Sequence, residues 1–250
     1  MTDALAGVVL AAGHGTRLRP LTLLRPKALC PVANVALVDL ALERVRPVVE
    51  AVAVNVHHRR AAMEAHLEEA GVHVSIEEPE PLGTAGALGQ LRGWLDGRAA
   101  LVVNADAWCP GSLGPFVEGW DGERVRLLIP GDDDLHPTSK VAGALMPWSA
   151  IEPLAAVPSG LYERSWRPAH AAGRLEVVRH DGPFVDCGTP ADYLRANLLA
   201  SGGASVVGDG AVVAGRLDRC VVWPGAVVWP PETLTCAIRM TDSATVLVRP

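Results

Sequence analysis

The segment from Val8 to Val32, VVLAAGHGTRLRPLTLLRPKALCPV, limits the fold more than any other part of this 250-residue chain. Ala6 to Ala12 is an uncharged run of small and β-branched residues, as expected of a parallel strand buried on both faces. Gly13 and Gly15 follow at once, and glycine lets the backbone take positive φ and bring its N–H groups close to a phosphate. The segment therefore predicts a strand that ends in a phosphate-binding turn.

Two cationic side chains after this turn are candidates to hold the phosphate. Arg17 offers a planar fork of donors, and Lys27 carries an ammonium on a segment stiffened by Pro26. The chain contains 20 arginines and only two lysines, Lys27 and Lys140, so arginine is its usual cation. A lysine at position 27 therefore indicates a need for a compact point charge, with chance retention as the alternative.

Other phosphate-binding motifs fit this segment poorly. It has no Gly-Lys-Ser/Thr, which excludes a P-loop, and Leu18 stands where the dinucleotide fingerprint needs its third glycine. The segment resembles the signature of the sugar-phosphate nucleotidylyltransferases, Gly-x-Gly-Thr-Arg-Leu-x-Pro-Leu-Thr followed by Pro-Lys-x-Leu-x-Pro-Val, at every fixed position from Gly13 to Val32. The resemblance implies an enzyme that transfers a nucleoside monophosphate from a nucleoside triphosphate (NTP) to a sugar 1-phosphate and releases pyrophosphate.

Strand-like and helix-like segments alternate beyond the signature. Val35–Val45 has the apolar spacing of a helix, Ala51–Val56 that of a buried strand, Arg60–Ala70 that of a helix and Val72–Ile76 that of a strand. This order predicts an α/β fold with a Rossmann-like mixed, mostly parallel sheet flanked by helices. Ligands on such sheets bind beyond the carboxyl ends of the strands.

The segment EEPEPLGTAGAL, residues 77–88, resembles the family's second nucleotide-contacting loop. Gly83 and Thr84 begin an alanine-rich stretch, and the family's base-contacting side chain corresponds to Glu78, five residues before the glycine. A carboxylate only accepts hydrogen bonds, so it suits the N1–H and amine donors of guanine better than uracil or thymine. GTP is therefore favoured, as in the mannose-1-phosphate guanylyltransferase members. A UTP- or dTTP-dependent transferase is the alternative, and a solvated acidic turn is the competing explanation for Glu78.

Two carboxylates form the Mg²⁺ site that the resemblance implies. Asp106 follows an apolar strand, where the family has Asn-Gly-Asp with a metal-holding aspartate, and Ala105 replaces the usual glycine. Asp186 lies in FVDCGTPADYLRAN, which resembles the family's closing signature, and supplies the second metal ligand. Independently of the resemblance, residues 188–190 (Gly-Thr-Pro) have a structural explanation as a helix start, because Thr189 and Pro190 predict a helix N-cap followed by proline at the first helical position.

The resemblance gives each matched residue an expected role. The expected catalytic residues are Arg17, Lys27 and Asp106. The expected nucleotide contacts are Leu10, Ala11, Ala12, Gly13, Gly15, Thr16, Arg17, Glu78, Gly83, Thr84 and Asn104. Lys27, Gly143 and Asp186 are expected at the sugar phosphate, and Asp106 and Asp186 at Mg²⁺.

The sugar-binding region matches the family least. Its members usually carry a Glu-Lys-Pro hairpin, which residues 126–147 lack. Lys140 stands too close to Gly143 to be the hairpin lysine and is interpreted as an exposed surface residue, and Asp132–Asp134 is interpreted as a solvated loop. The missing hairpin leaves one rival prediction open, a regulatory subunit that binds a nucleotide sugar without making one.

Composition narrows the partners and the location. A net charge of −6 and a pI of about 5.7 provide no basic stripe, so no nucleic acid is expected as a partner. The five scattered cysteines contain no C-x-x-C pair, which argues for reduced thiols rather than a disulfide framework or a zinc site. The N-terminal residues lack a signal-peptide pattern, and no apolar run approaches the ~20 residues of a membrane span. A cytoplasmic protein without a membrane partner is expected.

The composition changes after Ser201-Gly202-Gly203, which predicts a catalytic domain over 1–200 and a short segment over 204–250. Within that segment GAVV at 210–213 recurs at 225–228, which predicts a short left-handed β-helix of degenerate hexapeptide repeats. Two coils bury little by themselves. A cap on the catalytic domain or a homodimer contact would explain Trp223 and Trp229, with simple burial against the main domain as the alternative.

Overall fold

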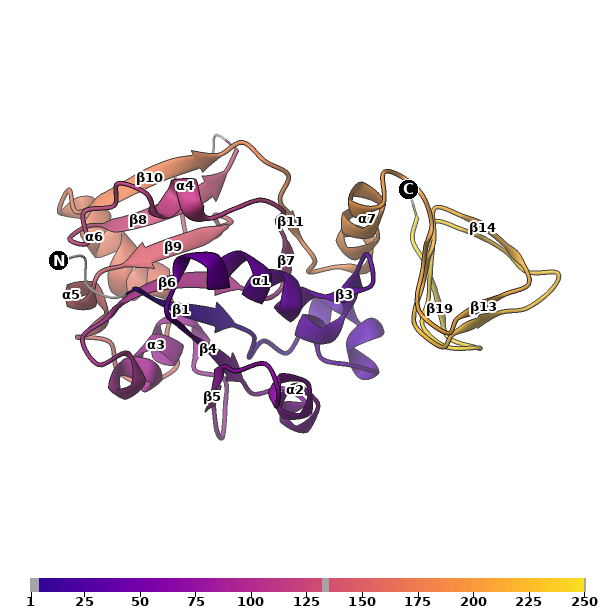
Figure 1. Ribbon diagram of the computed structural model, residues 1–250, viewed down its shortest axis with the longest axis horizontal. Coiled ribbons are helices and arrows are strands. Elements are labelled where there is room, and N and C mark those ends of the chain that lie inside the picture. Colours follow the sequence, from indigo (N-terminus) through magenta and orange to yellow (C-terminus); the bar gives the residue numbers. More distant parts are fainter. Residues whose placement is uncertain (1–4, 132–134, 250) are drawn as a thin grey trace. The chain divides into compact units, whose positions relative to one another are not determined.

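The computed structural model describes residues 5–131 and 135–249, which form two compact units (Figure 1). The first unit contains residues 5–14, 40–105, 109–131 and 135–184, and the second contains residues 15–39, 106–108 and 185–249. By its contacts, the signature segment from Gly15 onward therefore belongs with the C-terminal residues rather than with the strand before the glycine turn. The two domains anticipated from the sequence, 1–200 and 204–250, stay a prediction.

A central sheet organises the first unit. Its seven described strands have the order β10-β8-β9-β6-β1-β4-β5, and every neighbouring pair is parallel except the two that involve β9. The strands are β1 (Leu5–Leu10), β4 (Ala51–Val56), β5 (His73–Ile76), β6 (Ala99–Asn104), β8 (Val125–Pro130), β9 (Gly143–Met146) and β10 (Leu175–His180). The predicted mixed, mostly parallel sheet is confirmed, and the predicted strand over 51–56 has the bounds of β4.

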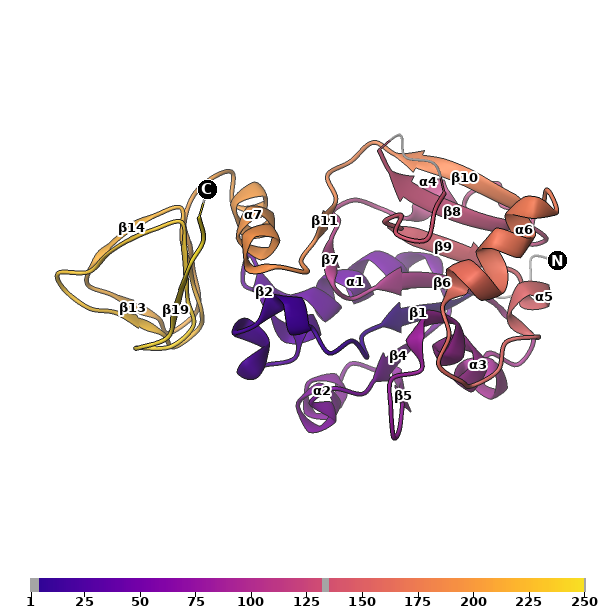
Figure 2. The ribbon, with the colours of Figure 1, turned by 180° about the vertical axis from the view of Figure 1, so that it is seen from behind.

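Helices cover both faces of this sheet. Figures 1 and 2 show α1 and α4 over one face, and α3, α5 and α6 over the other. The helices are α1 (Leu37–Val45), α2 (Arg60–Leu67), α3 (Gly83–Leu95), α4 (Gly114–Val117), α5 (Trp148–Ile151) and α6 (Arg167–Ala171), with a 3₁₀ turn η4 (Arg46–Val48) after α1 and a π-helical turn η5 (Tyr162–Trp166) before α6. The helix expected from Val35 begins at Leu37, because Val35 and Ala36 form a short strand instead.

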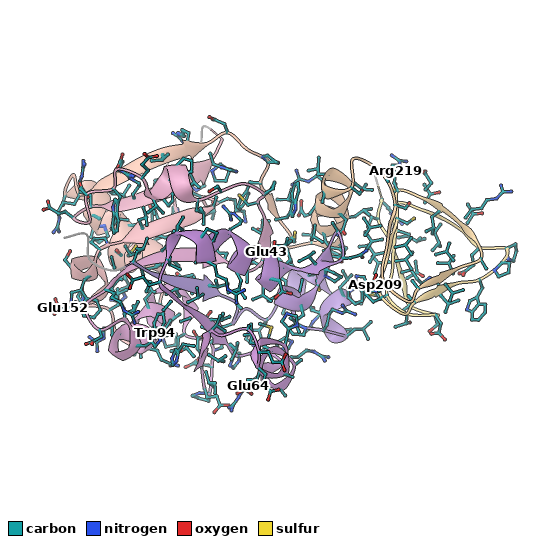
Figure 3. The ribbon with its side chains drawn as sticks, in the orientation of Figure 1. Glu43, Glu64, Trp94, Glu152, Asp209 and Arg219 are labelled. Carbon is teal, nitrogen blue, oxygen red and sulfur yellow. The ribbon has the colours of Figure 1, made fainter. Side chains whose placement is uncertain are left out.

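Apolar side chains that point to one face of the strands form the core of the first unit. Ala6 and Val8 on β1 point to one face and pack with Leu88 and Leu91 of α3, all four being buried. Burying large aliphatic side chains in this way stabilises a fold by about 1.5–3 kcal/mol each. Trp94, labelled in Figure 3, stacks on His73 at the end of the same helix. The α3 face of the sheet is therefore a packed apolar layer.

The signature segment has little regular structure in the second unit. It contains the 3₁₀ turns η1 (Thr16–Leu18), η2 (Leu21–Leu23) and η3 (Lys27–Leu29), followed by a hairpin of β2 (Pro31–Val32) and β3 (Val35–Ala36). A second antiparallel pair joins β7 (Ala107–Trp108) to β11 (Val185–Asp186). Helix α7 (Pro190–Ala200) follows, and its N-cap is Thr189, whose side chain accepts a hydrogen bond from Asp192 N at 3.2 Å, as predicted.

The chain then winds into a coil with three faces, each built from parallel strand pairs, and Figure 1 shows its triangular outline. Its strands are β12 (Val206–Val207), β13 (Val212–Val213), β14 (Arg216–Asp218), β15 (Val221–Val222), β16 (Val227–Val228), β17 (Thr233–Thr235), β18 (Ala237–Arg239) and β19 (Thr245–Leu247). The repeated tetrads pair in register, Val212 with Val227 and Val213 with Val228. Asp209 and Arg219, labelled in Figure 3, lie exposed at turns of the coil. These strands are consistent with the predicted β-helix-like appendage.

The two tryptophans of the coil have different surroundings. Trp223 is 1% exposed, whereas Trp229 is 54% exposed. Burial within the protein therefore explains Trp223, but it does not explain the exposed Trp229.

All five cysteines are free thiols, in agreement with the sequence-based prediction. Burial raises the pKa of Cys30 and of Cys187 to about 12, so both thiols stay protonated at neutral pH. Across residues 5–131 and 135–249, no helix combines the length and apolar character that crossing a membrane would require.

Candidate active site

The second unit brings three of the predicted site residues together. Lys27 Nζ lies 2.8 Å from Asp106 Oδ2 and 3.3 Å from Asp186 Oδ1, and it donates a hydrogen bond to each. The Lys27 side chain is 8% exposed, so the ammonium is held almost entirely by these carboxylates. Residues separated by 79 and 159 positions along the chain thus form one charged cluster, as the signature motifs together predicted.

The antiparallel pair β7–β11 places the two carboxylates side by side. Asp186 pairs with Ala107 in this ladder, and Cys187 N donates to Asp106 O at 3.0 Å. Asp186 ends β11 three residues before Thr189, the N-cap of α7. Hydrogen bonds therefore hold the backbone of each aspartate, which places the two side chains next to each other.

Arg17 approaches the same cluster from η1. Its Nη2 lies 3.8 Å from Asp186 Oδ2, and its side chain is 67% exposed, which leaves most of its donors open to a ligand. A Cβ at position 188 would lie 3.0 Å from Arg17 Nη2 and 3.1 Å from Asp186 Oδ1. Gly188 therefore leaves room for this pair, a role that the sequence analysis missed because the glycine also fitted a helix-start motif.

Gly15 has a structural role that differs from that of Gly13. Gly15 has a φ of +63°, and a Cβ there would lie 2.9 Å from Thr22 Cγ2 and 3.0 Å from Lys27 Cβ. It therefore needs to be glycine both for its conformation and for the packing of Lys27. At Gly13 an added Cβ would meet nothing within 4 Å, so the space in front of this residue is open.

The charge balance of the cluster keeps Lys27 protonated. Burial lowers the pKa of the Lys27 ammonium, but the charges and hydrogen bonds of Asp106 and Asp186 outweigh it, and the net effect is a pKa above the usual 10.5. The ammonium therefore persists throughout the neutral pH range and can bind phosphate oxygens.

The first unit holds the predicted nucleotide contacts other than Gly15, Thr16 and Arg17, and several of them lie at the carboxyl ends of its strands. Leu10 ends β1, Ala11 to Gly13 follow it, and Asn104 ends β6 beside β1 in register with Leu10. Ala11 N donates to Asn55 Oδ1 at 2.7 Å, and Asn55 is 3% exposed. Ala105, at the position of the family's glycine, is fully buried and donates from its N–H to Leu10 O at 2.9 Å. The backbone around the glycine turn is therefore fixed by hydrogen bonds.

The two adjacent glutamates after β5 have opposite environments. Glu78 is 63% exposed at its side chain and accepts a hydrogen bond from Arg60 Nη1 at 2.6 Å. Glu77 is fully buried and accepts hydrogen bonds from Asn55 Nδ2 at 2.7 Å and from Leu82 N at 2.6 Å. Asn55 thus connects the backbone before the glycine turn to Glu77, in the loop that is predicted to contact the base. Its place near the end of an apolar strand was a sequence signal for this role, whereas nothing in the sequence separates Glu77 from Glu78.

Gly83 and Thr84 have structural partners in the segment 155–161. A Cβ on Gly83 would lie 2.6 Å from Ser159 O, and Thr84 Oγ1 accepts a hydrogen bond from Leu161 N at 2.8 Å. Farther along α3, a Cβ on Gly86 would lie 2.3 Å from Val157 O. These residues therefore let a distant segment lie directly on the helix, and their role as nucleotide contacts stays a prediction.

Gly143, which is expected at the sugar phosphate, lies in an apolar environment. Gly143 begins β9, is buried, and would place a Cβ 3.4 Å from Phe116 Cε1, a contact with an apolar ring. Lys140 is exposed, in agreement with its interpretation as a surface lysine. Asp132 to Asp134 lie outside the described residues.

The donor set of the cluster fits Mg²⁺. This ion prefers hard oxygen ligands and commonly takes one or two protein carboxylates together with phosphate oxygens and water. Asp106 and Asp186 supply two such carboxylates, and the Asp106 side chain is 46% exposed. In the described part of the chain, His, Cys, Asp and Glu side chains form no metal-binding group of three or more. A magnesium ion here would therefore take its other ligands from substrate and solvent.

Comparisons with known proteins show the family to which the chain belongs. Residues 6–124 match the family described as Nucleotidyl transferase. The chain is 40% identical to an N-acetylmuramate alpha-1-phosphate uridylyltransferase of Caulobacter vibrioides, over 76% of this chain and 94% of that protein. It is 32% identical to a mannose-1-phosphate guanylyltransferase of Mycobacterium tuberculosis, over 95% of this chain and 80% of that protein. The chain therefore belongs to the sugar-phosphate nucleotidyltransferase family and is an enzyme of that class.

A solved structure supports the fold along the whole chain. The crystal structure described as mannose-1-phosphate geranyltransferase from Thermus thermophilus superposes with a TM-score of 0.70, at 18% identity, over 99% of this chain and 95% of that one. At this identity the likeness concerns the fold alone. It includes the C-terminal coil as well as the sheet.

Proposed function

We propose that the protein forms a GDP-sugar and pyrophosphate from GTP and a sugar 1-phosphate, with Mg²⁺ as its cofactor. The observation that carries this proposal is the position of Lys27 between Asp106 and Asp186, with the exposed Arg17 beside them. A buried ammonium between two carboxylates, next to an open guanidinium, suits substrates whose reacting groups are phosphates.

Each side chain of the cluster has a role in the proposed reaction. Lys27 orients the sugar phosphate so that its oxygen attacks the α-phosphorus of the nucleotide in line. Arg17 stabilises the negative charge that develops on the departing pyrophosphate. Asp106 and Asp186 would hold Mg²⁺, which would supply neutralisation of the phosphate charge. Because backbone hydrogen bonds fix both aspartates, this arrangement is preorganised for positioning and charge neutralisation.

Glu78 supports the choice of GTP. Its carboxylate is largely exposed, so it is accessible to a ligand, and it can accept hydrogen bonds from the N1–H and amine of guanine. Arg60, which donates to one of its oxygens, would set the direction of the carboxylate. The proposal therefore predicts that Glu78→Gln lowers the preference for GTP over UTP, because an amide can both donate and accept.

A UTP-dependent reaction is the second candidate. It is favoured by the 40% identity to a relative named as a uridylyltransferase. The two candidates differ only in the base, so the phosphate-transfer cluster does not separate them.

One experiment separates these candidates from a protein without catalysis. The protein is incubated with Mg²⁺, one of the common nucleoside triphosphates and one of a panel of sugar 1-phosphates, and the released pyrophosphate is measured. Release with GTP alone supports the proposal, and release with UTP or dTTP supports the second candidate. Tight binding of a nucleotide sugar without pyrophosphate release for any pair would instead identify a regulatory subunit.

A further inference from the structure

The C-terminal elements contact the signature segment on both sides of Lys27. Before it, Arg25 lies over the ring of Trp223, with the guanidinium carbon 4.0 Å from the ring centroid. After it, Pro31 O accepts a hydrogen bond from the hydroxyl of Tyr193, on α7. Lys27 therefore lies on a short stretch of chain whose two ends are fixed by residues 193 and 223.

Trp223 connects these two contacts. Its Nε1 donates to Tyr193 Oη at 2.9 Å, so the same indole touches Arg25 with its face and Tyr193 with its edge. Trp223 and Tyr193 are 1% and 0% exposed. The buried Tyr193 hydroxyl accepts a hydrogen bond from Trp223 and donates one to Pro31 O. This pair permits little movement, because each group is satisfied in only one arrangement.

The hairpin that follows is attached in the same way. Its turn residues, Ala33 and Asn34, have positive φ of 49° and 67°. Ala33 N donates to Asn197 Oδ1 at 3.0 Å, and Asn34 Nδ2 donates to Val207 O at 2.8 Å. Asn197 is fully buried on α7, and Val207 ends the first strand of the coil. Both α7 and the coil thus hold the signature segment.

We propose that the C-terminal coil is a positioning element of the phosphate-transfer cluster, and that Trp223 is the positioning residue through which it acts on Lys27. This inference rests on the proposed function. Trp223 of the coil holds the segment around Lys27 through Arg25 and through Tyr193 of α7, and Asp186 lies three residues before Thr189, where α7 is capped. Both partners in the Lys27–Asp186 pair are therefore placed by the C-terminal elements, and loss of the Trp223 contacts releases one of them.

The lysine content of the chain permits a test that needs no substrate. Lys27 and Lys140 are its two lysines, one almost buried and one exposed, so an amine-acylating reagent with peptide mass spectrometry reports each separately. In Trp223→Leu we expect acylation of Lys27 to accelerate roughly tenfold, because the segment opens locally more often. Lys140 should not change. Trp229→Leu is the matched control, since Trp229 lies on the same coil with its side chain exposed.

Two milder substitutions keep the test valid if Trp223→Leu does not fold. Trp223→Phe retains an aromatic face for Arg25 but removes the indole N–H, and Tyr193→Phe removes the hydroxyl that bonds to Pro31. Both should raise the acylation rate of Lys27 by a factor of about two to five while the far-UV circular dichroism stays that of the wild type. Unchanged Lys27 reactivity in both folded variants would overturn the proposal, whatever their thermal stability.

Steady-state kinetics give the second readout. The Trp223 variants should lower kcat roughly tenfold and raise the KM for sugar 1-phosphate, with the KM for the nucleotide within about twofold of wild type. Equal rises in both KM values, or no change in any constant, would contradict a positioning role. If wild type itself releases no pyrophosphate while Lys27 reactivity responds to Trp223, the proposed function fails and the structural coupling stands.

Discussion

Two glycine-rich segments of the chain, Gly13–Gly15 and Gly83–Gly89, follow strands of one sheet but use their glycines differently. The first segment leaves space at Gly13, where a Cβ would meet nothing within 4 Å, although a Cβ at Gly15 would lie 2.9 Å from Thr22 Cγ2. The second is filled, because a Cβ at Gly86 or Gly89 would lie 2.3 Å from backbone atoms of the segment 155–157. The comparison teaches that glycine after a strand provides room, and that only the structure tells whether the protein itself fills that room.

The charged residues near the two segments differ in their surroundings. Lys27 is buried and paired with two carboxylates, whereas Glu78 is largely exposed and paired with one arginine. Substitutions near the first segment should therefore change turnover more than stability. Substitutions in α3, which contains the second segment, should change stability more than turnover.

Removal of Lys27 should have the largest effect. We expect Lys27→Ala to lower turnover by about 10³-fold, since a preorganised cation at a phosphate-transfer site contributes on this scale. Pyrophosphate release under saturating substrates measures it. Lys140→Ala is the matched control and should retain wild-type turnover; a Lys27→Ala protein that also retained it would remove the basis for the proposed reaction.

Gly86→Ala tests the filled segment. The added methyl group would overlap Val157 O. The free energy of unfolding, measured in urea, should therefore be about 3 kcal/mol lower than that of wild type. Gly93 lies on the same helix with nothing within 4 Å of an added Cβ, and Gly93→Ala should stabilise by up to about 1 kcal/mol. Equal stability of the two variants would show that segment 155–157 does not rest on the helix.

Gly13→Ala tests the open segment. Stability should stay within about 0.5 kcal/mol of wild type, because the methyl group meets no protein atom. The KM for the nucleotide should rise roughly tenfold if a phosphate occupies that space. Thermal unfolding and initial rates check the two parts separately. A destabilised Gly13→Ala variant with an unchanged KM for the nucleotide would show that the protein, and not a ligand, fills the space at Gly13.

The smallest effect concerns pH. The pKa of Lys27 is raised in the folded protein, so its stabilising contribution is complete below the unfolded value of 10.5 and is lost as the pH rises through the higher folded value. The difference in unfolding free energy between wild type and Lys27→Met should therefore be constant from pH 7 to about 9.5 and become smaller above pH 10.5. A difference that changed near pH 7 would mean that the ammonium is not held by the carboxylates.

Much of this arrangement could be predicted because local patterns determine it. The apolar strand before Gly13 and the Thr189-Pro190 helix start depend on nearby residues, and both form as expected. The cluster of Lys27, Asp106 and Asp186 was predicted only through motif resemblance, because residues so far apart in sequence meet through tertiary structure.

The parts that sequence reasoning missed depend on contacts between distant segments. Gly188 looked like part of a helix start, yet its missing side chain leaves room for Arg17 and Asp186. Glu77 and Glu78 are adjacent and identical in type, and only the burial of one by Asn55 and Leu82 distinguishes them. Trp223 and Trp229 were likewise equivalent in the sequence, and their exposures differ by the packing of α7.

The in-register tetrads of the coil have a consequence for how such a chain can change in length. Gly210 and Gly225 occupy equivalent corners with φ of 68° and 73°, and the valines that follow them pair directly. An insertion of one whole coil would preserve the inward and outward direction of every side chain, whereas an insertion of part of a coil would reverse them. Trp223 follows β15, which lies between β12 and β18 in the sheet order, so a coil added beyond β18 would leave its hydrogen bond to Tyr193 in place.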